Sequence, residues 1–356
     1  MILQYSDAIL LQEKFWHGTW VPKCGLLRHE RRLLIIYISK GTEKNCYEIP
    51  GQSSNTRERK ETAPRWATNQ AGFMSMGHHY LPQYYLKGFT ETNDNMLWAY
   101  EKKTGRKFNT QIKSLANITD FYSQETEQYL ANDIEGPANA VLDKIRSRNL
   151  INDDDKNAFA EYMAVMWKRV PRAKEDLKKM APRLADGIAK KLSGDLDHII
   201  AEETQKAEFI EKRRKEIDDI LSIYATNPPK DIWLENIPPG RTPRIVEAMK
   251  AMTWTFWEFD EQPVFLTCDN PVFYFTGMGV GRKDSEISFP ISSQVVLWAT
   301  WRADLPRNFI KASTQIVKEM NRRTVHNASR FVFHSRNEHW MVPFVKKKNW
   351  KLNRIA

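Results

Sequence analysis

The chain has 356 residues, enough for a sizeable hydrophobic core in one elaborated domain or two small ones. Its 41% hydrophobic and 28% charged residues are ordinary for a globular protein and exclude disorder throughout the chain. The formal net charge is +10, of which +6 lies beyond residue 73. That surplus is mild for its length, so it permits nucleic-acid binding without implying it.

Membrane insertion and secretion have no support in the sequence. The longest apolar window, Leu33 to Ile38, is far shorter than the roughly eighteen residues that a membrane span needs. No charged start, apolar stretch and cleavage site follow one another at the N-terminus. The cysteines, Cys24, Cys46 and Cys268, show no metal-ligand spacing and no disulfide framework. We therefore predict a cytoplasmic protein.

Residues 1–73 lack sustained helical or strand periodicity, and they hold 11 Lys/Arg against 7 Asp/Glu. Met74 and Met76 follow directly. The simplest interpretation is that translation begins at one of these methionines and that the upstream residues are a non-native or disordered extension. The alternative is a genuine, loosely packed extension with a short strand at residues 33–38.

Hydrophobic periodicity predicts the elements that follow. The predicted helices cover residues 138–147, 156–179, 182–224, 243–252 and 313–327. Asn152 is expected to cap the second helix, and Pro171 to kink it. The predicted strands cover residues 96–101, 107–112, 253–259, 264–267, 272–276, 286–289, 294–300 and 331–333.

These elements predict an α+β fold in a single domain over residues 74–335. A helical section at about 136–227 separates a short N-terminal β-rich piece from a mainly antiparallel C-terminal sheet at about 253–335. Residues 336–356 contain Lys346, Lys347, Lys348 and Lys351, and are expected to form a solvated basic tail.

The adjacent imidazoles of His78 and His79 are the first candidate for a functional site. A histidine can act as a metal ligand or as a general base near neutral pH. Two neighbouring residues on a strand point to opposite faces, whereas a turn entering Pro82 could aim both in one direction. The alternative is one imidazole hydrogen-bonded in the core and the other exposed.

The segment Thr267 to Pro271 is the second candidate. Asp269 and Asn270 follow the end of a predicted strand, where a rigid element can hold a carboxylate for metal or proton chemistry. The alternative is an Asx-turn, in which Asp269 bonds the backbone two residues further on. Cys268 has no basic neighbour in the sequence, so a nucleophilic thiol is not expected.

Three further residues are weaker candidates. Glu135 lies near the positive end of a predicted helix, and Arg169 and Arg172 are spaced three apart on another helix. Such an arginine pair can share a face and bind a carboxylate or phosphate. The alternative for all three is a solvated surface.

These residues, in this order, resemble the bacterial domain-of-unknown-function family 4238. The resemblance covers about Gly77 to Ser335 and rests on His78 to Leu86, Asn117, Phe121-Tyr122-Ser123, Ile134-Glu135, Arg169, Arg172, Phe265 to Pro271, Phe289 to Ser292 and Asn321. Cys268 departs from it, because a serine is expected there. The resemblance implies a prokaryotic α+β protein in which His78, His79, Glu135, Asp269 and Asn270 belong to one site. It names no substrate.

Two functions are compatible with these residues. The first is a metal-assisted hydrolase acting on a phosphate-containing substrate, with a divalent metal held by His78, His79 and Asp269. In it Glu135 serves as ligand or base, and Arg169 and Arg172 hold the anion. The second is a non-catalytic binding module, with nucleic acid as a candidate partner, or a structural partner in a larger system.

Overall fold

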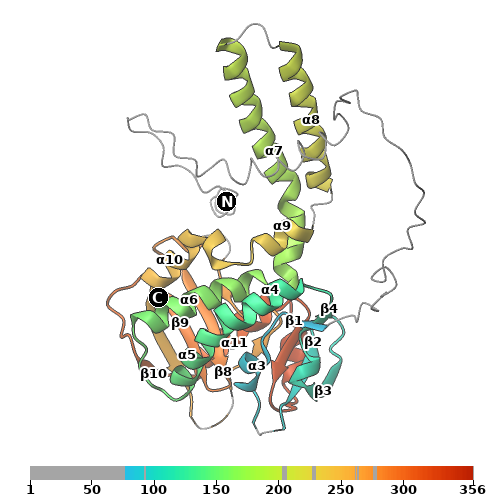
Figure 1. Cartoon of the computed structure of the whole chain (residues 1–356). Coiled ribbons are helices and arrows are strands. Elements are labelled where there is room, and N and C mark those ends of the chain that lie inside the picture. The colour runs from blue at the N-terminus through green and yellow to red at the C-terminus, as the bar shows by residue number, and fades with distance from the viewer. Residues whose placement is uncertain are drawn as a thin grey trace, which may run out of the picture. The chain divides into compact units, whose positions relative to one another are not determined.

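The computed structural model describes most of the chain from Gly77 onward. The described residues are 77–91, 94–202, 207–226, 230–260, 262, 264–275 and 279–355. The interpretation of residues 1–73 and of the two candidate start methionines lies outside this part of the chain. Within it, helices and antiparallel sheets form the predicted α+β fold (Figure 1).

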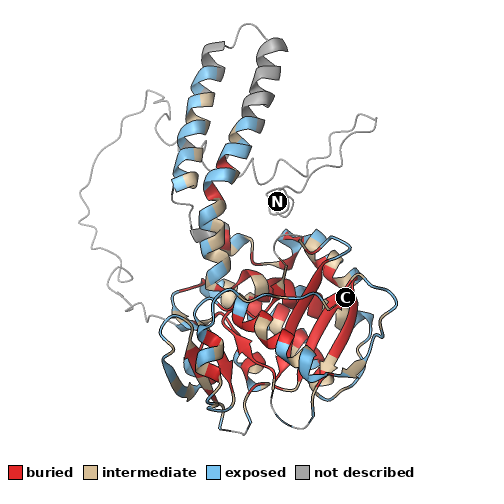
Figure 2. Cartoon of the chain, turned by 180° about the vertical axis from the view of Figure 1, so that it is seen from behind, coloured by how far each residue is buried: buried red, intermediate tan, exposed pale blue. Residues whose placement is uncertain are grey.

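The larger sheet has the strand order β10-β5-β9-β8-β7. Its neighbours are antiparallel except for the parallel pair of β10 and β5. The strands are β5 (Thr253–Glu258), β7 (Phe273–Tyr274), β8 (Glu286–Ser292), β9 (Val295–Thr300) and β10 (Phe309–Lys311). Every residue of β8 and β9 is buried, so this sheet is covered on both faces (Figure 2).

Alternation along β9 assigns its residues to two cores. Leu297 packs in the main hydrophobic cluster, whereas Val296 and Trp298 pack in a second cluster with Met320 of α11 (Thr314–Asn327). Successive side chains of a strand point to opposite faces, which explains this division. Residues Glu286 to Thr300 therefore need apolar partners on both sides.

Helices α3 (Gln83–Lys87), α5 (Gly136–Arg146) and α6 (Asp153–Lys168) contribute buried side chains to the main hydrophobic cluster. The ring of Tyr85 stacks on Phe289 of β8 at 5.3 Å, and Phe159 lies 5.9 Å from the same ring. Asn152 caps α6 as predicted, in a reciprocal capping box with Asp155.

A smaller sheet has the order β3-β2-β11-β6. Its strands are β2 (Met96–Glu101), β3 (Lys107–Gln111), β6 (Thr267–Cys268) and β11 (Phe331–His334). The N-terminal hairpin thus shares one sheet with C-terminal strands, which the sequence had assigned to separate pieces. A separate pair joins β1 (Gly77–His79) to β4 (Asn117–Thr119).

The helical section differs from the prediction at Pro171. This proline does not kink a helix but begins a new one, α7 (Pro171–Glu202), because the first turn of a helix needs no backbone N–H from it. Helix α7 packs against α8 (Ala207–Thr226), and α9 (Lys230–Glu235) and α10 (Pro243–Ala251) follow. No helix in the described ranges is both long and apolar enough to cross a bilayer.

The C-terminal segment is packed, in contrast to the expected solvated tail. Its lysines are exposed, but Met341 and Val345 of α12 (Met341–Lys346) are buried in a third cluster. Further on, the Ile355 N–H donates to Glu286 Oε1 at 2.9 Å. Buried apolar residues before the lysines and a backbone hydrogen bond after them tie residues 336–355 to the fold.

Candidate functional site

Arg169 is the centre of a buried polar cluster. It follows the end of α6 and is 1% exposed. Its Nη1 donates to Glu135 Oε1 at 2.5 Å, its Nη2 to the His79 carbonyl oxygen at 2.6 Å, and its Nε to the Tyr122 hydroxyl at 3.4 Å. We name this set, with the neighbouring His78 and Glu127, the arginine cluster.

The backbone around the arginine cluster is irregular in three places. Glu135 ends a π-helix, Leu130–Glu135, a conformation that is rare and often found at functional sites. Ala116 and Asp120 have φ angles of 51° and flank β4, the strand that pairs with β1. Non-glycine residues seldom adopt this left-handed conformation, so the surrounding structure must hold them in it.

Both histidines are hydrogen-bonded within the protein. His78 is 4% exposed, and its Nδ1 accepts the backbone N–H of Tyr122 at 3.1 Å. His79 is partly exposed, and its Nε2 lies 2.8 Å from the Lys113 carbonyl oxygen, which requires a proton on that nitrogen. This arrangement matches the alternative of one core histidine and one more exposed.

Glu127 is a member of the arginine cluster that the sequence analysis missed. It lies on the short polar helix α4 (Gln124–Tyr129), which carries no motif or apolar face that would have singled it out. Its Oε2 is buried and has no hydrogen-bond partner. Burial raises the pKa of Glu127, and the nearby Arg169 guanidinium opposes this rise.

Asp269 accepts hydrogen bonds from a turn that is distant from it in the sequence. It is 4% exposed; its Oδ1 accepts the Ser329 N–H at 2.7 Å, and its Oδ2 accepts the N–H groups of Arg330 and Phe331 at 2.7 and 3.1 Å. These bonds differ from the alternative of an Asx-turn, because they join Asp269 to residues some sixty positions along the chain. Burial raises the pKa of Asp269, although the three amides stabilise its ionised form.

The predicted metal ligands do not form a metal-binding group. Across the ranges that the structure describes, no three or more His, Cys, Asp or Glu side chains are arranged to hold an ion. The Nδ1 atom of His78 and the carboxylate of Asp269 accept hydrogen bonds from backbone amides. These bonds explain the positions of the two side chains. Cys268 is a buried free thiol whose pKa is raised by burial, in line with the expectation that it is not a nucleophile.

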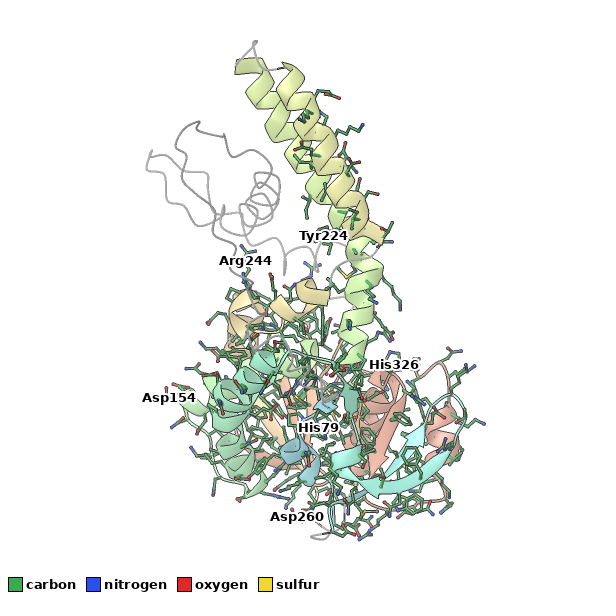
Figure 3. The ribbon with its side chains drawn as sticks, turned by 45° about the vertical axis from the view of Figure 1, so that its right-hand side comes forward. His79, Asp154, Tyr224, Arg244, Asp260 and His326 are labelled. Carbon is green, nitrogen blue, oxygen red and sulfur yellow. The ribbon has the colours of Figure 1, made fainter. Side chains whose placement is uncertain are left out.

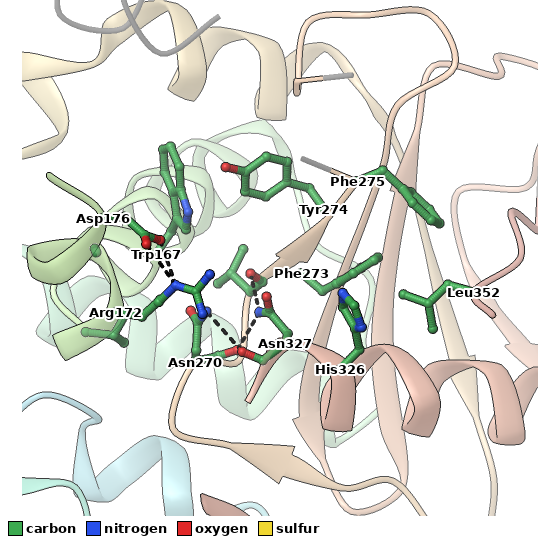
Figure 4. Close-up of a pocket in the computed structure, with 13 residues that line it drawn as sticks. Trp167, Arg172, Asp176, Asn270, Phe273, Tyr274, Phe275, His326, Asn327 and Leu352 are labelled. Atoms are coloured by element: carbon green, nitrogen blue, oxygen red, sulfur yellow. Dashed lines mark hydrogen bonds and ion pairs between the residues drawn. The ribbon is translucent and has the colours of Figure 1, made fainter. Parts of the chain in front are cut away.

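A second site is a pocket of about 210 Å³ between the start of α7, β7 and the end of α11 (Figure 4). Aromatic rings form much of its wall: Trp167 and Tyr274 meet edge to face at 5.4 Å, and Phe273 and Phe275 meet at 5.1 Å. Its polar lining comes from Arg172, Asp176, Asn270, His326 and Asn327.

Asn270 lines this pocket, and one of its side-chain atoms has no hydrogen-bond partner. It is 7% exposed, and its Nδ2 donates to the Asn327 carbonyl oxygen at 3.3 Å. Its Oδ1 is buried without a partner. The neighbouring Asn327 amide donates to the carbonyl oxygens of Asn270 and Val272 at 2.6 and 3.0 Å, which commits both of its N–H groups.

Two cationic groups lie near His326, of which Arg172 lines the pocket and Lys102 does not. Arg172 donates through Nε to both carboxylate oxygens of Asp176, at 3.0 and 2.8 Å (Figure 4). Lys102 donates to the carbonyl oxygens of His326 and Ala328 at 3.3 and 2.5 Å. The pKa of His326 is lowered by partial burial, and further by Lys102 and Arg172.

The structure thus divides the predicted site residues. His78, His79, Glu135 and Arg169 come together in the arginine cluster, whereas Asn270 and Arg172 line the pocket. Figure 3 labels one histidine of each site, His79 and His326. No pattern in the sequence pointed to His326 and Asn327. They lie at the end of α11, a helix that was predicted from its apolar positions alone.

The fold and these two sites define an α+β protein with a buried arginine cluster and an aromatic, polar pocket. A model of the family described as "Protein of unknown function (DUF4238)" matches residues 77–338. The chain belongs to this family, which confirms the resemblance seen in the sequence. No curated protein and no solved structure matches the chain.

Proposed function

We propose that the pocket binds a phosphate-bearing small molecule with a planar ring, of the nucleotide type. The main observation behind this proposal is the Oδ1 atom of Asn270, which is buried and has no hydrogen-bond partner. A buried acceptor without a partner destabilises the protein by about 1–3 kcal/mol. Because this oxygen is buried in the free protein, the Asn270 amide must rotate for a ligand N–H to reach it, and the bond would then recover that energy.

The pocket walls favour a planar ring. Trp167, Tyr274 and Phe273 offer aromatic surface next to the Asn270 amide. Specific ligand pockets combine such apolar walls with a few oriented polar groups. A heteroaromatic base carries both a π-face and ring N–H groups, so one ligand can satisfy the walls and the unpaired acceptor together.

The charges favour a phosphate. Arg172 lines the pocket, and together with Lys102 it lowers the pKa of His326. An anion beside these groups offsets their mutual repulsion and allows His326 to take up a proton. Asp176 already bonds Arg172, which orients the guanidinium.

Metal-assisted hydrolysis is not part of this proposal. His78 and Asp269 bond backbone amides, and Glu135 bonds Arg169. These contacts support structural roles for the residues that hydrolysis would require. The proposal therefore follows the binding-module hypothesis, in a reducing cytoplasm where Cys268 remains a thiol.

Calorimetric titration of the full chain tests the proposal. Adenosine and guanosine monophosphate should bind, and adenosine or inorganic phosphate alone should bind at least about tenfold more weakly, because each fills only half of the site. Arg172→Gln should weaken nucleotide binding roughly 10- to 100-fold, the loss expected for a charge-assisted hydrogen bond.

Lys179→Gln is the matched control. Lys179 lies on the same helix, is 71% exposed and contacts the same Asp176 at 4.0 Å, but it does not line the pocket. Its loss should leave binding unchanged. Equal losses in the two variants, or nucleotide binding no tighter than that of inorganic phosphate, would overturn the proposal.

A further inference from the structure

A second surface, which shares no residue with the pocket, combines exposed cations with aromatic rings. It joins the turn between β2 and β3 to the end of α12. Its six basic side chains are all exposed: Lys103, Arg106, Lys107, Lys346, Lys347 and Lys348. We call this set the basic surface.

The two halves of the basic surface are in contact. Gly105, in the turn, has a φ of 76°, and a Cβ built on it would lie 2.7 Å from Lys346 Cδ and 3.2 Å from Val342 Cγ1. A side chain at this position would collide with α12, so glycine allows the turn to pack directly on the helix. Lys107 Nζ also donates to Asn337 Oδ1 at 2.9 Å, just before α12.

The positive charge of this surface is only partly compensated. Glu101, at the end of β2, accepts from Thr104 at 2.6 Å and from Arg330 at 2.9 Å. Its carboxylate is thus engaged by an arginine outside the set. Glu101 also interacts with Arg106 of the set, so part of the positive charge of the basic surface is offset, and the whole chain has a net charge of +10. Such a concentration of cations attracts polyanions.

Aromatic rings lie among the cations. Lys347 Nζ lies 4.5 Å from the centre of the Trp350 ring, which packs against Phe344 at 4.8 Å. On the other half, the Arg106 guanidinium lies 5.3 Å from the centre of the Phe108 ring. Cations interleaved with aromatic rings are typical of surfaces that hold single strands, because phosphates bind the former and bases stack on the latter.

We propose that the basic surface binds single-stranded nucleic acid. An anionic membrane is the competing polyanion, and membrane insertion requires exposed large apolar side chains beside the cations. Among the described residues, the exposed large hydrophobic residues are Leu150, Ile188 and Ile223, none of which belongs to this surface. Phe344 and Trp350 are only partly exposed.

Fluorescence anisotropy with a labelled twenty-nucleotide single strand tests this proposal on the full chain. The charge-reversal variant Lys346→Glu/Lys347→Glu/Lys348→Glu should bind at least about 100-fold more weakly at 50 mM salt. If the three lysines each neutralise one phosphate, the slope of log affinity against log salt should flatten by roughly 2. The turn variant Lys103→Glu/Arg106→Glu/Lys107→Glu should behave similarly, which separates the effect from a local change in α12.

The control carries the same charge change on the helical pair: Lys178→Glu/Lys190→Glu/Lys212→Glu, all at exposed positions. It should retain binding within about threefold. Arg172→Gln should also retain oligonucleotide binding, because Arg172 is not part of this surface, so failure here is distinguishable from failure of the pocket. Equal weakening in the control, or binding to phosphatidylserine vesicles without binding to the strand, would overturn the proposal.

Discussion

The arginine cluster and the pocket are both partly buried and polar, but they differ in how their hydrogen bonds are met. In the cluster, the central Arg169 guanidinium bonds Glu135, His79 and Tyr122, and the unpartnered Glu127 Oε2 lies at its edge. In the pocket, the side-chain Oδ1 of Asn270 is buried without a partner. The first arrangement resembles a folded core, and the second resembles a site that a ligand completes.

This difference separates structural from functional roles. A buried charge such as Arg169, each of whose nitrogens has a partner, holds elements together, and removing it leaves other groups unpaired. A pocket residue with an open acceptor can be changed with little effect on folding but a large effect on binding.

Arg169→Met should destabilise the protein by about 3–5 kcal/mol, because Glu135 would remain as a partly buried carboxylate without its partner. Urea denaturation measures this loss. The matched variant Arg172→Met, at a side chain that is 49% exposed, should change the free energy of unfolding by less than about 1 kcal/mol. Similar losses in both variants would erase the distinction between the two regions.

Asp269→Ala should destabilise the protein by about 2–4 kcal/mol, since three backbone N–H groups lose their acceptor. Thermal unfolding measures the effect. Asp260→Ala, at a solvent-exposed ion pair, is the control and should have little effect. If the Asp269 variant folded normally and lost only ligand binding, its role would be functional rather than structural.

His326 should change its pKa on ligand binding. In the free protein its pKa is lowered, so the imidazole is neutral at pH 7. A bound phosphate favours the protonated form and should raise this pKa. Proton NMR of the His326 ring, with and without adenosine monophosphate, measures the change. A constant or falling pKa would place the phosphate elsewhere.

Glu127→Gln should stabilise the protein slightly, by less than about 1 kcal/mol, because Glu127 is partly exposed. The pKa of Glu127 is raised in the folded state, so its ionisation destabilises that state. The variant should match the wild type near pH 4 and become the more stable form as pH rises through the folded pKa. Urea denaturation at pH 4 and pH 7 tests the sign, and a variant less stable at pH 7 would contradict it.

Local patterns in the sequence predicted most of the fold. Asn152 and its acidic neighbours marked a helix start, and the apolar positions of 313–327 marked α11. Pro171 was assigned to a kink because a proline gives the same signal inside a helix and in its first turn. Sheet pairing between β2 and β11 was not predictable, because it depends on register over more than 200 residues.

The candidate site was predictable only in part. His78, Glu135 and Arg169 do come together, and so do Asn270 and Arg172, but as two sites. A sequence pattern can show that a polar residue stands at an unusual position. It cannot show whether that residue will form its hydrogen bonds inside the protein. The backbone amides that bond Asp269 come from a turn sixty residues away, and no local pattern reveals them.

The most direct test is a nucleotide titration followed through the side-chain amide signals of asparagine. Adding adenosine monophosphate should shift the Nδ2 signals of Asn270 in a saturable way. The backbone signal of Tyr122, whose N–H already bonds His78, should stay in place. Shifts at Tyr122 with none at Asn270 would contradict the assignment of binding to the pocket and of structural support to the arginine cluster.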